Sequence, residues 1–245
     1  MNYSRYYLSG KEWARIIVEY LVIDIAFSYL FYDSLPAFVV GLMGMFPYIL
    51  YRKKGLSIKR KDVLREQFLE LIGVVSGKMR GGMSCENAMV DSISDMEGMY
   101  GRGSLICKEL KLIEMRLNHQ ESLSVILKDL GKRSGVEDIY EFAEVFSIAR
   151  AGSGKMRAVI EDTSVMMREK NETESEIYVL ISGKRLEQRI MCIIPLVIMI
   201  YLKLQAGDFI NVLYHNALGI TVMSACLIVY IISYLMAEKV VNIEV

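Results

Sequence analysis

Four long runs of apolar residues divide the chain, two near its start and two near its end. They cover residues 13–32, 35–51, 190–206 and 217–237. Each approaches the length of about 20 residues that a helix needs to cross a hydrocarbon core about 30 Å thick. The pattern predicts four transmembrane helices, two in residues 1–51 and two in residues 189–245.

The region between these runs, residues 52–188, has apolar residues at helical spacing. The first stripe recurs every three or four residues and so lies on one face of a helix: Phe68, Leu71, Ile72, Val75 and Met79. Similar stripes follow in 106–117, 123–130 and 139–149, separated by "RGGMS", "GMYGRGS" and "GKRSG", whose glycines and serines are typical of turns. We therefore predict an all-α membrane protein in which a cytoplasmic helical bundle lies between two pairs of transmembrane helices.

An internal repeat relates the two halves of this middle region. The stretch "RGGMSCENAM" (80–89) aligns with "RAGSGKMRAV" (150–159) at a spacing of 70 residues, and both stretches join two predicted helices. The alignment predicts a two-fold repeat of a helical hairpin. We expect Gly82 and Gly152 to lie where φ is positive or where two backbones approach closely, and Gly154 to belong to the second turn.

Charge is distributed unevenly along the chain, although its 29 basic and 29 acidic residues balance. A basic stretch follows the second apolar run: Arg52, Lys53, Lys54, Lys59, Arg60, Lys61 and Arg65. Because Lys and Arg accumulate on the cytoplasmic side of membrane proteins, both termini and the middle region are expected in the cytoplasm. The basic stretch is expected to contact anionic lipid or a partner protein rather than nucleic acid.

Several polar residues and one proline interrupt the apolar runs. Glu19 and Asp24 lie inside the first run, where an ionisable side chain is costly and is a functional candidate by default. Pro195 predicts a kink in the third run, and Lys203 lies near its end. An alternative function stays open at this point, a small transporter or channel in which Glu19, Asp24 and Lys203 line a path.

The stretch "ARAGSGKMRAV", residues 149–159, invites comparison with a nucleotide-binding P-loop. That motif needs a glycine five positions before its Gly-Lys pair and a Ser or Thr after it, but these positions hold Ala149 and Met156. The stretch therefore predicts a turn between helices. The two histidines lie far apart and the four cysteines lack metal-ligand spacing, so we expect no enzyme and no catalytic, cofactor or metal site.

The order of these segments resembles the type II secretion F domain. The resemblance covers residues from about 60 to about 240 and rests on three stretches: "RGGMSCENAM", "SIARAGSGKMRAVIEDTSVMMREK" and "SGKRLEQRIMCIIPLVIMI". The arrangement of one F domain between paired apolar runs resembles the platform proteins of tight-adherence pilus systems.

This resemblance implies a function without catalysis, in the inner membrane of the cell. Platform proteins of this kind connect a hexameric cytoplasmic secretion ATPase to pilin subunits in the bilayer and help to extract and assemble the pilins. Because the chain holds one F domain, the resemblance also implies a second F-domain protomer, from another copy or from a sister protein.

Overall fold

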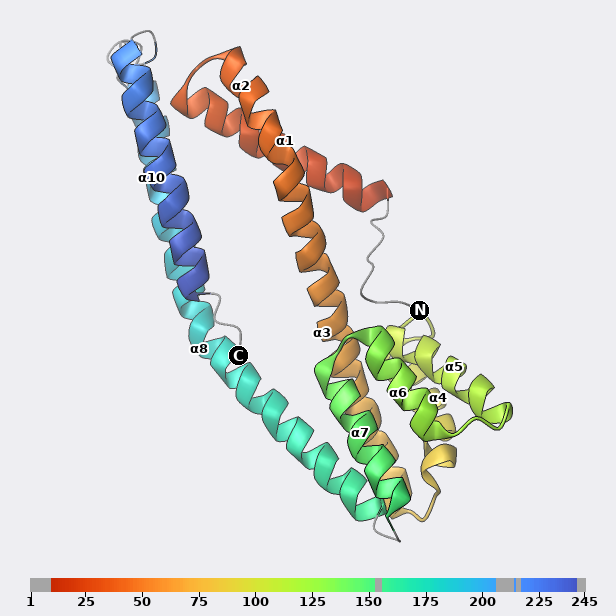
Figure 1. The fold of residues 1–245 in the computed structure, drawn as a ribbon. Coiled ribbons are helices and arrows are strands. Elements are labelled where there is room, and N and C mark those ends of the chain that lie inside the picture. The colour runs from red at the N-terminus through yellow and green to blue at the C-terminus, as the bar shows by residue number, and fades with distance from the viewer. Residues whose placement is uncertain (1–9, 153–155, 206–213, 215–216, 242–245) are drawn as a thin grey trace. The chain divides into compact units, whose positions relative to one another are not determined.

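The computed structural model describes residues 10–152, 156–205, 214 and 217–241, and every regular element among them is a helix. The predicted all-α class is therefore confirmed. The helices, shown in Figure 1, are α1 (Gly10–Phe31), α2 (Leu35–Gly41), the short 3-10 helix η1 (Leu42–Gly44), α3 (Met45–Arg80), α4 (Cys85–Tyr100), α5 (Leu105–Asn118), α6 (Leu123–Ser134), α7 (Glu137–Ala151), α8 (Met156–Gln205) and α10 (Ala217–Val241).

These residues form two compact units. Unit 1 contains the described residues from 53 to 172, and unit 2 contains those from 10 to 52 and from 173 to 241. Both places where the chain passes from one unit to the other lie within helices, the first in α3 and the second in α8. The structure places these crossings at 52/53 and 172/173, whereas the sequence predicted domain boundaries at 51/52 and 188/189.

The core of unit 1 is built from the apolar stripes of its helices. All five stripe residues of α3 are buried, and the stripes of α5, α6 and α7 join the same core. Phe142 of α7 is buried in this core, with its ring centroid 5.4 Å from that of Phe68 on α3 and 6.3 Å from that of Phe146. A single short helix is only marginally stable in water. These helices gain stability because they bury their apolar faces against one another.

Polar side chains define where α4 and α5 begin. Ser84 accepts a hydrogen bond from the Asn87 amide, and Ser104 accepts one from the Cys107 amide. At α5 a second side chain helps, because Oε1 of the buried Gln67 on α3 accepts from the Ile106 amide at 3.1 Å. The first amides of a helix lack partners within the helix, so these side-chain acceptors satisfy donors that the helix itself leaves unpaired.

Helices α6 and α7 approach each other closely at a glycine, Gly131. A Cβ atom added to Gly131 would lie 2.8 Å from Cα and 3.2 Å from N of Tyr140, so a side chain would collide with backbone. The connection between the two helices is tight: Gly135 has φ of 61°, in the left-handed region, and Ser134 donates to the Gly131 carbonyl.

The glycines expected in the two repeat turns differ from each other. Gly82 has φ of 96°, a conformation that side chains disfavour. Gly152 has φ of −88°, and an added Cβ would make only ordinary contact with the Ile148 carbonyl at 3.7 Å. Neither of the reasons expected for a glycine therefore applies at Gly152. Gly154 lies outside the described residues.

The prediction of four transmembrane helices is wrong. Within the described part of the chain, one helix is long and apolar enough to cross a membrane, namely Leu218–Val240 in α10. The first apolar run lies in α1, which also carries Glu12, Arg15, Glu19 and Asp24. Each charge near the centre of a span costs several kcal/mol on transfer scales, roughly 2.5–3.5, and so weakens α1 as a candidate.

The second and third runs fail for reasons of helix geometry. The second run is split among the 7-residue α2, η1 and the start of α3, so no single helix contains it. The third run forms the end of the 50-residue helix α8, where Arg189 and Lys203 bound an apolar segment shorter than the about 20 residues of a span. Helix α8 continues through Pro195.

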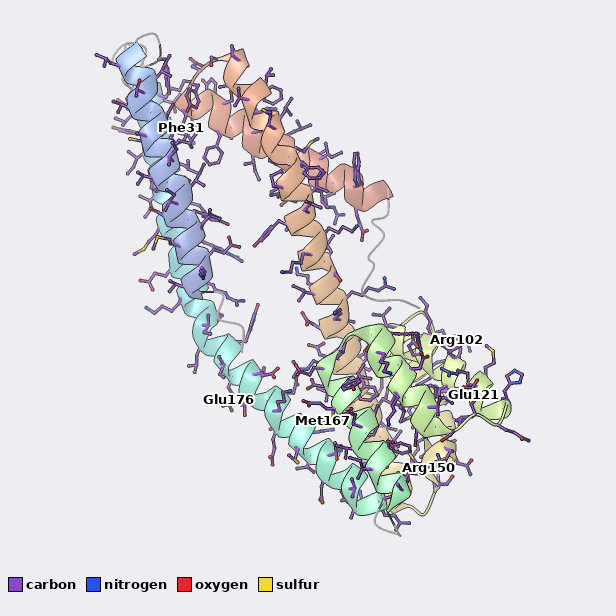
Figure 2. All side chains as sticks on the ribbon, viewed as in Figure 1. Phe31, Arg102, Glu121, Arg150, Met167 and Glu176 are labelled. Atoms are coloured by element: carbon purple, nitrogen blue, oxygen red, sulfur yellow. The ribbon has the colours of Figure 1, made fainter. Side chains whose placement is uncertain are left out.

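Unit 2 has a small core and a large exposed apolar surface. Leu30 and Phe31 of α1 pack with Tyr214, Met223 of α10 and Leu196 of α8, and Phe31 is labelled in Figure 2. By contrast, many large apolar side chains of α8 and α10 are more than half exposed, among them Leu180, Leu186, Met191, Leu204, Leu218, Val229 and Met236. Exposed apolar surface of this extent is typical of regions that contact lipid or another protein.

Candidate functional site: charged positions of the two units

The structure separates the basic stretch into residues that hold the fold together and residues that face solvent. Arg52 pairs with Glu19 in unit 2, and in unit 1 Arg65 pairs with Asp138. Lys61 donates to the Gly135 carbonyl at 3.1 Å and so binds the connection between α6 and α7. Each of these three residues therefore contacts another part of the chain.

The other residues of the stretch lie on the outer surface of α3. Lys53, Lys54 and Lys59 are exposed, and Arg60 is partly exposed. In the described parts of the chain, no ion pair involves the three lysines, whereas Arg60 has an interaction of its own. These three lysines are therefore positions of the predicted basic stretch that a lipid or protein partner can reach.

Asp138, in the first turn of α7, is a buried carboxylate that joins three helices. It accepts hydrogen bonds from Arg65 of α3 and from Lys170 of α8, the latter at 2.7 Å. Burial alone would raise the pKa of this carboxyl, but the hydrogen bonds from Lys170 and Arg65, together with their positive charges, outweigh burial and lower the pKa. The arrangement therefore stabilises unit 1 while Asp138 is ionised.

We expect Asp138→Asn to reduce the stability of unit 1 at neutral pH and to weaken its acid sensitivity. Because the folded-state pKa of Asp138 lies below its unfolded value, its contribution is complete above the unfolded pKa of about 4 and is lost as pH falls through the folded pKa. The variant should lose about 1.5–3 kcal/mol at pH 7, the range for hydrogen bonds to charged groups.

Hydrogen exchange of unit 1 amides at pH 7 and after a step to about pH 3 measures this difference. Asp162→Asn, at an exposed aspartate of α8, is the matched control and should change neither value. An Asp138→Asn variant with the same deficit at both pH values would contradict the assignment.

A second charged network joins α5 to α6. Glu109 is 2 % exposed and accepts two hydrogen bonds from Arg133, at 3.0 and 3.4 Å. Arg133 also contacts Asp129, which in turn accepts from Arg116 of α5 at 2.8 Å. A bidentate contact of this kind fixes the relative rotation of two helices, because the planar guanidinium allows few orientations.

The two predicted turns are linked by reciprocal ion pairs within unit 1. Arg80, the last residue of α3, pairs with Glu161 of α8 at 3.4 Å. Arg150, in the last turn of α7 and labelled in Figure 2, pairs with Glu86 of α4 at 3.0 Å. The two arginines are equivalent in the 70-residue alignment, and each contacts the second helix of the other hairpin. As exposed pairs they contribute little stability, about 0–1 kcal/mol each.

The polar residues predicted to lie inside the membrane do not come together as one pathway. Glu19 pairs with Arg52, and Lys203 pairs with Asp33 at 3.1 Å while donating to the Tyr29 carbonyl at 2.6 Å. Asp24 is 8 % exposed, packs against Gly41 of α2, and has one carboxylate oxygen without a hydrogen-bond partner. Each residue thus has its own surroundings in unit 2.

The cysteines of unit 1 lie outside these networks. Cys85 and Cys107 are buried in unit 1, and burial raises the pKa of the Cys85 thiol to about 12, so it stays protonated. Among the described residues, no group of three or more His, Cys, Asp or Glu side chains is placed to hold a metal ion. Residues 153–155 of the glycine-lysine turn lie outside those residues, and α7 precedes it where a P-loop would need a strand.

Sequence reasoning missed the buried polar residues, although a signal was present. Glu109 lies three residues after Ile106 and four before Ile113, and Asp138 lies four before Phe142. A charged residue at an apolar-stripe position is buried and therefore needs a partner.

Comparison of the chain with models of known protein families, with curated proteins and with solved structures found no match.

Proposed function

We propose that the chain is a membrane platform protein of a tight-adherence or type IV pilus-like assembly machine, or of a type II secretion machine. In this role it couples a cytoplasmic secretion ATPase to the extraction and assembly of pilin subunits. The observation that carries the proposal is the order of motif stretches that resembles an F domain, in a chain that combines a helical bundle with a strongly apolar unit.

The two units differ in their surfaces, and this difference supports a protein with one part in the membrane and one part in the cytoplasm. Unit 1 has a continuous buried core and a charged surface, as expected of a domain in water. Unit 2 exposes large apolar side chains and contains the candidate membrane helix in α10. We place unit 2 in the cytoplasmic membrane and unit 1 in the cytoplasm, where a motor can reach it.

The chain passes between its units through helices, which suits a protein that transmits force. Both crossings lie inside long helices, α3 and α8, so the backbone there makes helical hydrogen bonds. The phosphate chemistry belongs to the partner ATPase in this proposal. A second F-domain protomer completes the platform.

The exposed lysines of α3 provide the test. We expect affinity purification of the full chain in detergent to recover the secretion ATPase of the same cell. Replacing Lys53, Lys54 and Lys59 by Glu should lower that recovery about tenfold or more, because opposite charge repels where steering charge attracted. The matched control reverses three other exposed lysines of unit 1, Lys108, Lys128 and Lys132.

Each outcome has a distinct meaning. Equal losses in both triple variants would show that overall charge, and not this surface, governs recovery. Absence of any secretion ATPase from the wild-type preparation would contradict the platform function itself, as would ATP hydrolysis by the purified chain alone.

The transporter or channel alternative has less support. It requires Glu19, Asp24 and Lys203 to face a shared path, yet Glu19 and Lys203 are each neutralised by a different partner, Arg52 and Asp33. Ion flux through vesicles containing the purified chain would be the result that favours this alternative.

A further inference from the structure

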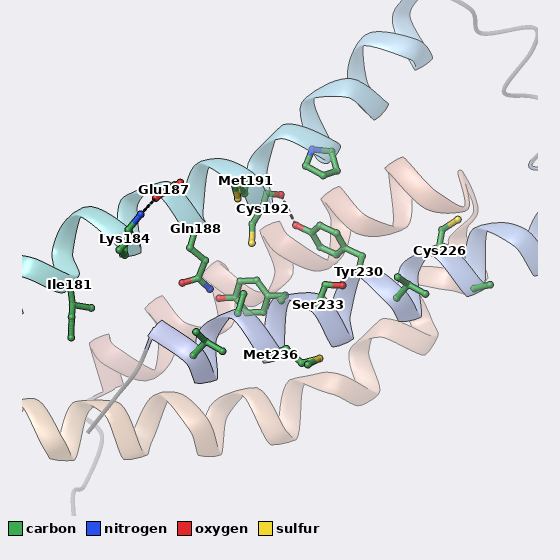
Figure 3. A pocket seen from close by; sticks show the side chains of 16 residues that line it. Ile181, Lys184, Glu187, Gln188, Met191, Cys192, Cys226, Tyr230, Ser233 and Met236 are labelled. Carbon is green, nitrogen blue, oxygen red and sulfur yellow. Dashed lines mark hydrogen bonds and ion pairs between the residues drawn. The ribbon is translucent and has the colours of Figure 1, made fainter. Parts of the chain in front are cut away.

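A groove with a volume of about 1030 Å³ lies in unit 2 between the second half of α8 and α10. Figure 3 shows its lining, which is apolar over most of its length. The two helices run side by side in opposite directions along it, as Figure 1 shows, and the Tyr230 hydroxyl donates to the Cys192 carbonyl at 2.8 Å. The α10 side belongs to the candidate membrane helix, Leu218–Val240.

The two ends of the groove differ in polarity. One end is lined by Pro195 of α8 and by Ala225 and Cys226 of α10. At the other end, Lys184, Glu187 and Gln188 of α8 lie opposite the C-terminal turns of α10. Lys184 pairs with Glu187 at 2.9 Å, but its side chain remains 75 % exposed.

The helix segments around the polar end carry more basic than acidic residues. Next to the lining residues, α8 carries Arg185 and Arg189, and α10 carries Lys239 between Ala237 and Val240. Opposed to these and to Lys184 are Glu187 and Glu238, and Glu238 accepts a hydrogen bond from Tyr51. The polar end therefore favours an anionic group.

We propose that this groove binds one anionic phospholipid, with an acyl chain along the apolar lining and the phosphate beside Lys184. The inference rests on the placement of α10 in the membrane, but not on the ATPase or pilin partners. The expected ligand has a single negatively charged polar group that is joined to a long apolar chain.

The polarity gradient favours a lipid over another helix as the occupant. A transmembrane helix of a partner would present apolar side chains over the whole length of the groove, including the end that Lys184, Glu187 and Gln188 line. A phospholipid matches both ends, since basic residues near the membrane surface attract anionic headgroups and the chain covers the apolar wall.

Native mass spectrometry of the full chain provides the test. The detergent-solubilised protein is mixed with equal amounts of palmitoyl-oleoyl phosphatidylglycerol and phosphatidylcholine, and we expect one phosphatidylglycerol to be retained preferentially. Lys184→Glu should lower its retention about tenfold, because reversing one charge near an anionic headgroup removes one attraction and adds one repulsion. Lys108→Glu, at an exposed lysine of unit 1, should leave retention unchanged.

A pair of α10 variants locates the acyl chain. Ser233 lines the groove, whereas the neighbouring Ile232 is 51 % exposed and does not line it. Ser233→Trp should abolish retention of both lipids, and Ile232→Trp should preserve it. Circular dichroism confirms that both variants keep their helix content, so a loss in Ser233→Trp alone reports the filled groove.

Three results would overturn the proposal. One is a phosphatidylglycerol preference that Lys184→Glu leaves unchanged, and another is equal retention in Ser233→Trp and Ile232→Trp. The third is a disulfide-linked dimer through Cys226, which lines the groove and is exposed, formed equally with and without lipid, because it would identify a second copy of the chain as the occupant. Loss of ATPase recovery with lipid retention intact would contradict the platform function alone.

Discussion

Replacing Phe142 by Ala is expected to lower the free energy of unfolding of unit 1 by about 3–5 kcal/mol, the range for truncating a buried phenylalanine. The Phe142 side chain is 1 % exposed and contacts the rings of Phe68 and Phe146. Truncation removes both aromatic contacts and leaves a cavity among α3 and α7. Hydrogen exchange of unit 1 amides in the full chain measures the loss without requiring unit 2 to unfold.

Ile148→Ala provides the control on the same helix. Its side chain is 73 % exposed, so truncation should change the stability of unit 1 by no more than about 0.5 kcal/mol. Similar losses for Phe142→Ala and Ile148→Ala would contradict the placement of the α7 stripe in the core. A large loss at Ile148 alone would instead mean that this face of α7 is covered.

Gly131→Val is expected to destabilise unit 1 by about 3 kcal/mol, at the upper end of the range for overpacking. The atoms that a side chain would meet are Cα and N of Tyr140, which belong to the backbone of α7 and cannot rotate away. Helices α6 and α7 would have to separate, and the contact of Lys61 with Gly135 would be disturbed. Hydrogen exchange should show the loss first in α6 and α7.

Gly98→Ala is the control for Gly131→Val, because it changes the backbone entropy of a helical glycine without a steric collision. Gly98 lies inside α4, and an added Cβ would meet nothing within 4 Å. This substitution should stabilise unit 1 by about 0.5–1 kcal/mol, because alanine loses less conformational freedom than glycine on helix formation. A stabilising Gly131→Ala would contradict the close approach of α6 and α7.

The helices of unit 1 could be predicted because their signals are local. The stripe from Phe68 to Met79 identifies the buried face of α3 from spacing alone, and "RGGMS" marks the turn where α3 ends and α4 begins. The close approach at Gly131 could not be predicted in the same way. An isolated glycine in a helical pattern also occurs at Gly98, and only the position of Tyr140 distinguishes the two.

The apolar runs show where local patterns mislead. A run of apolar residues does not reveal that residues 35–51 divide among α2, η1 and α3, or that residues 190–205 continue a charged helix. The candidate site shows the same limit. Lys53 and Arg65 look alike in the sequence, but Arg65 lies against Asp138 in the core, 73 residues away along the chain, whereas Lys53 is exposed.

Sequence patterns alone predict that the chain is helical, where the turns of unit 1 fall, and which faces of its helices are apolar. These properties depend on contacts between residues three or four positions apart, which the spacing of side chains records directly. The three-dimensional fold was needed to show which basic residues pair with Asp138 and Glu109, which glycine allows two backbones to approach closely, and which apolar run forms a continuous candidate span. Those depend on residues distant in the chain, and on the desolvation that makes a buried charge require its partner.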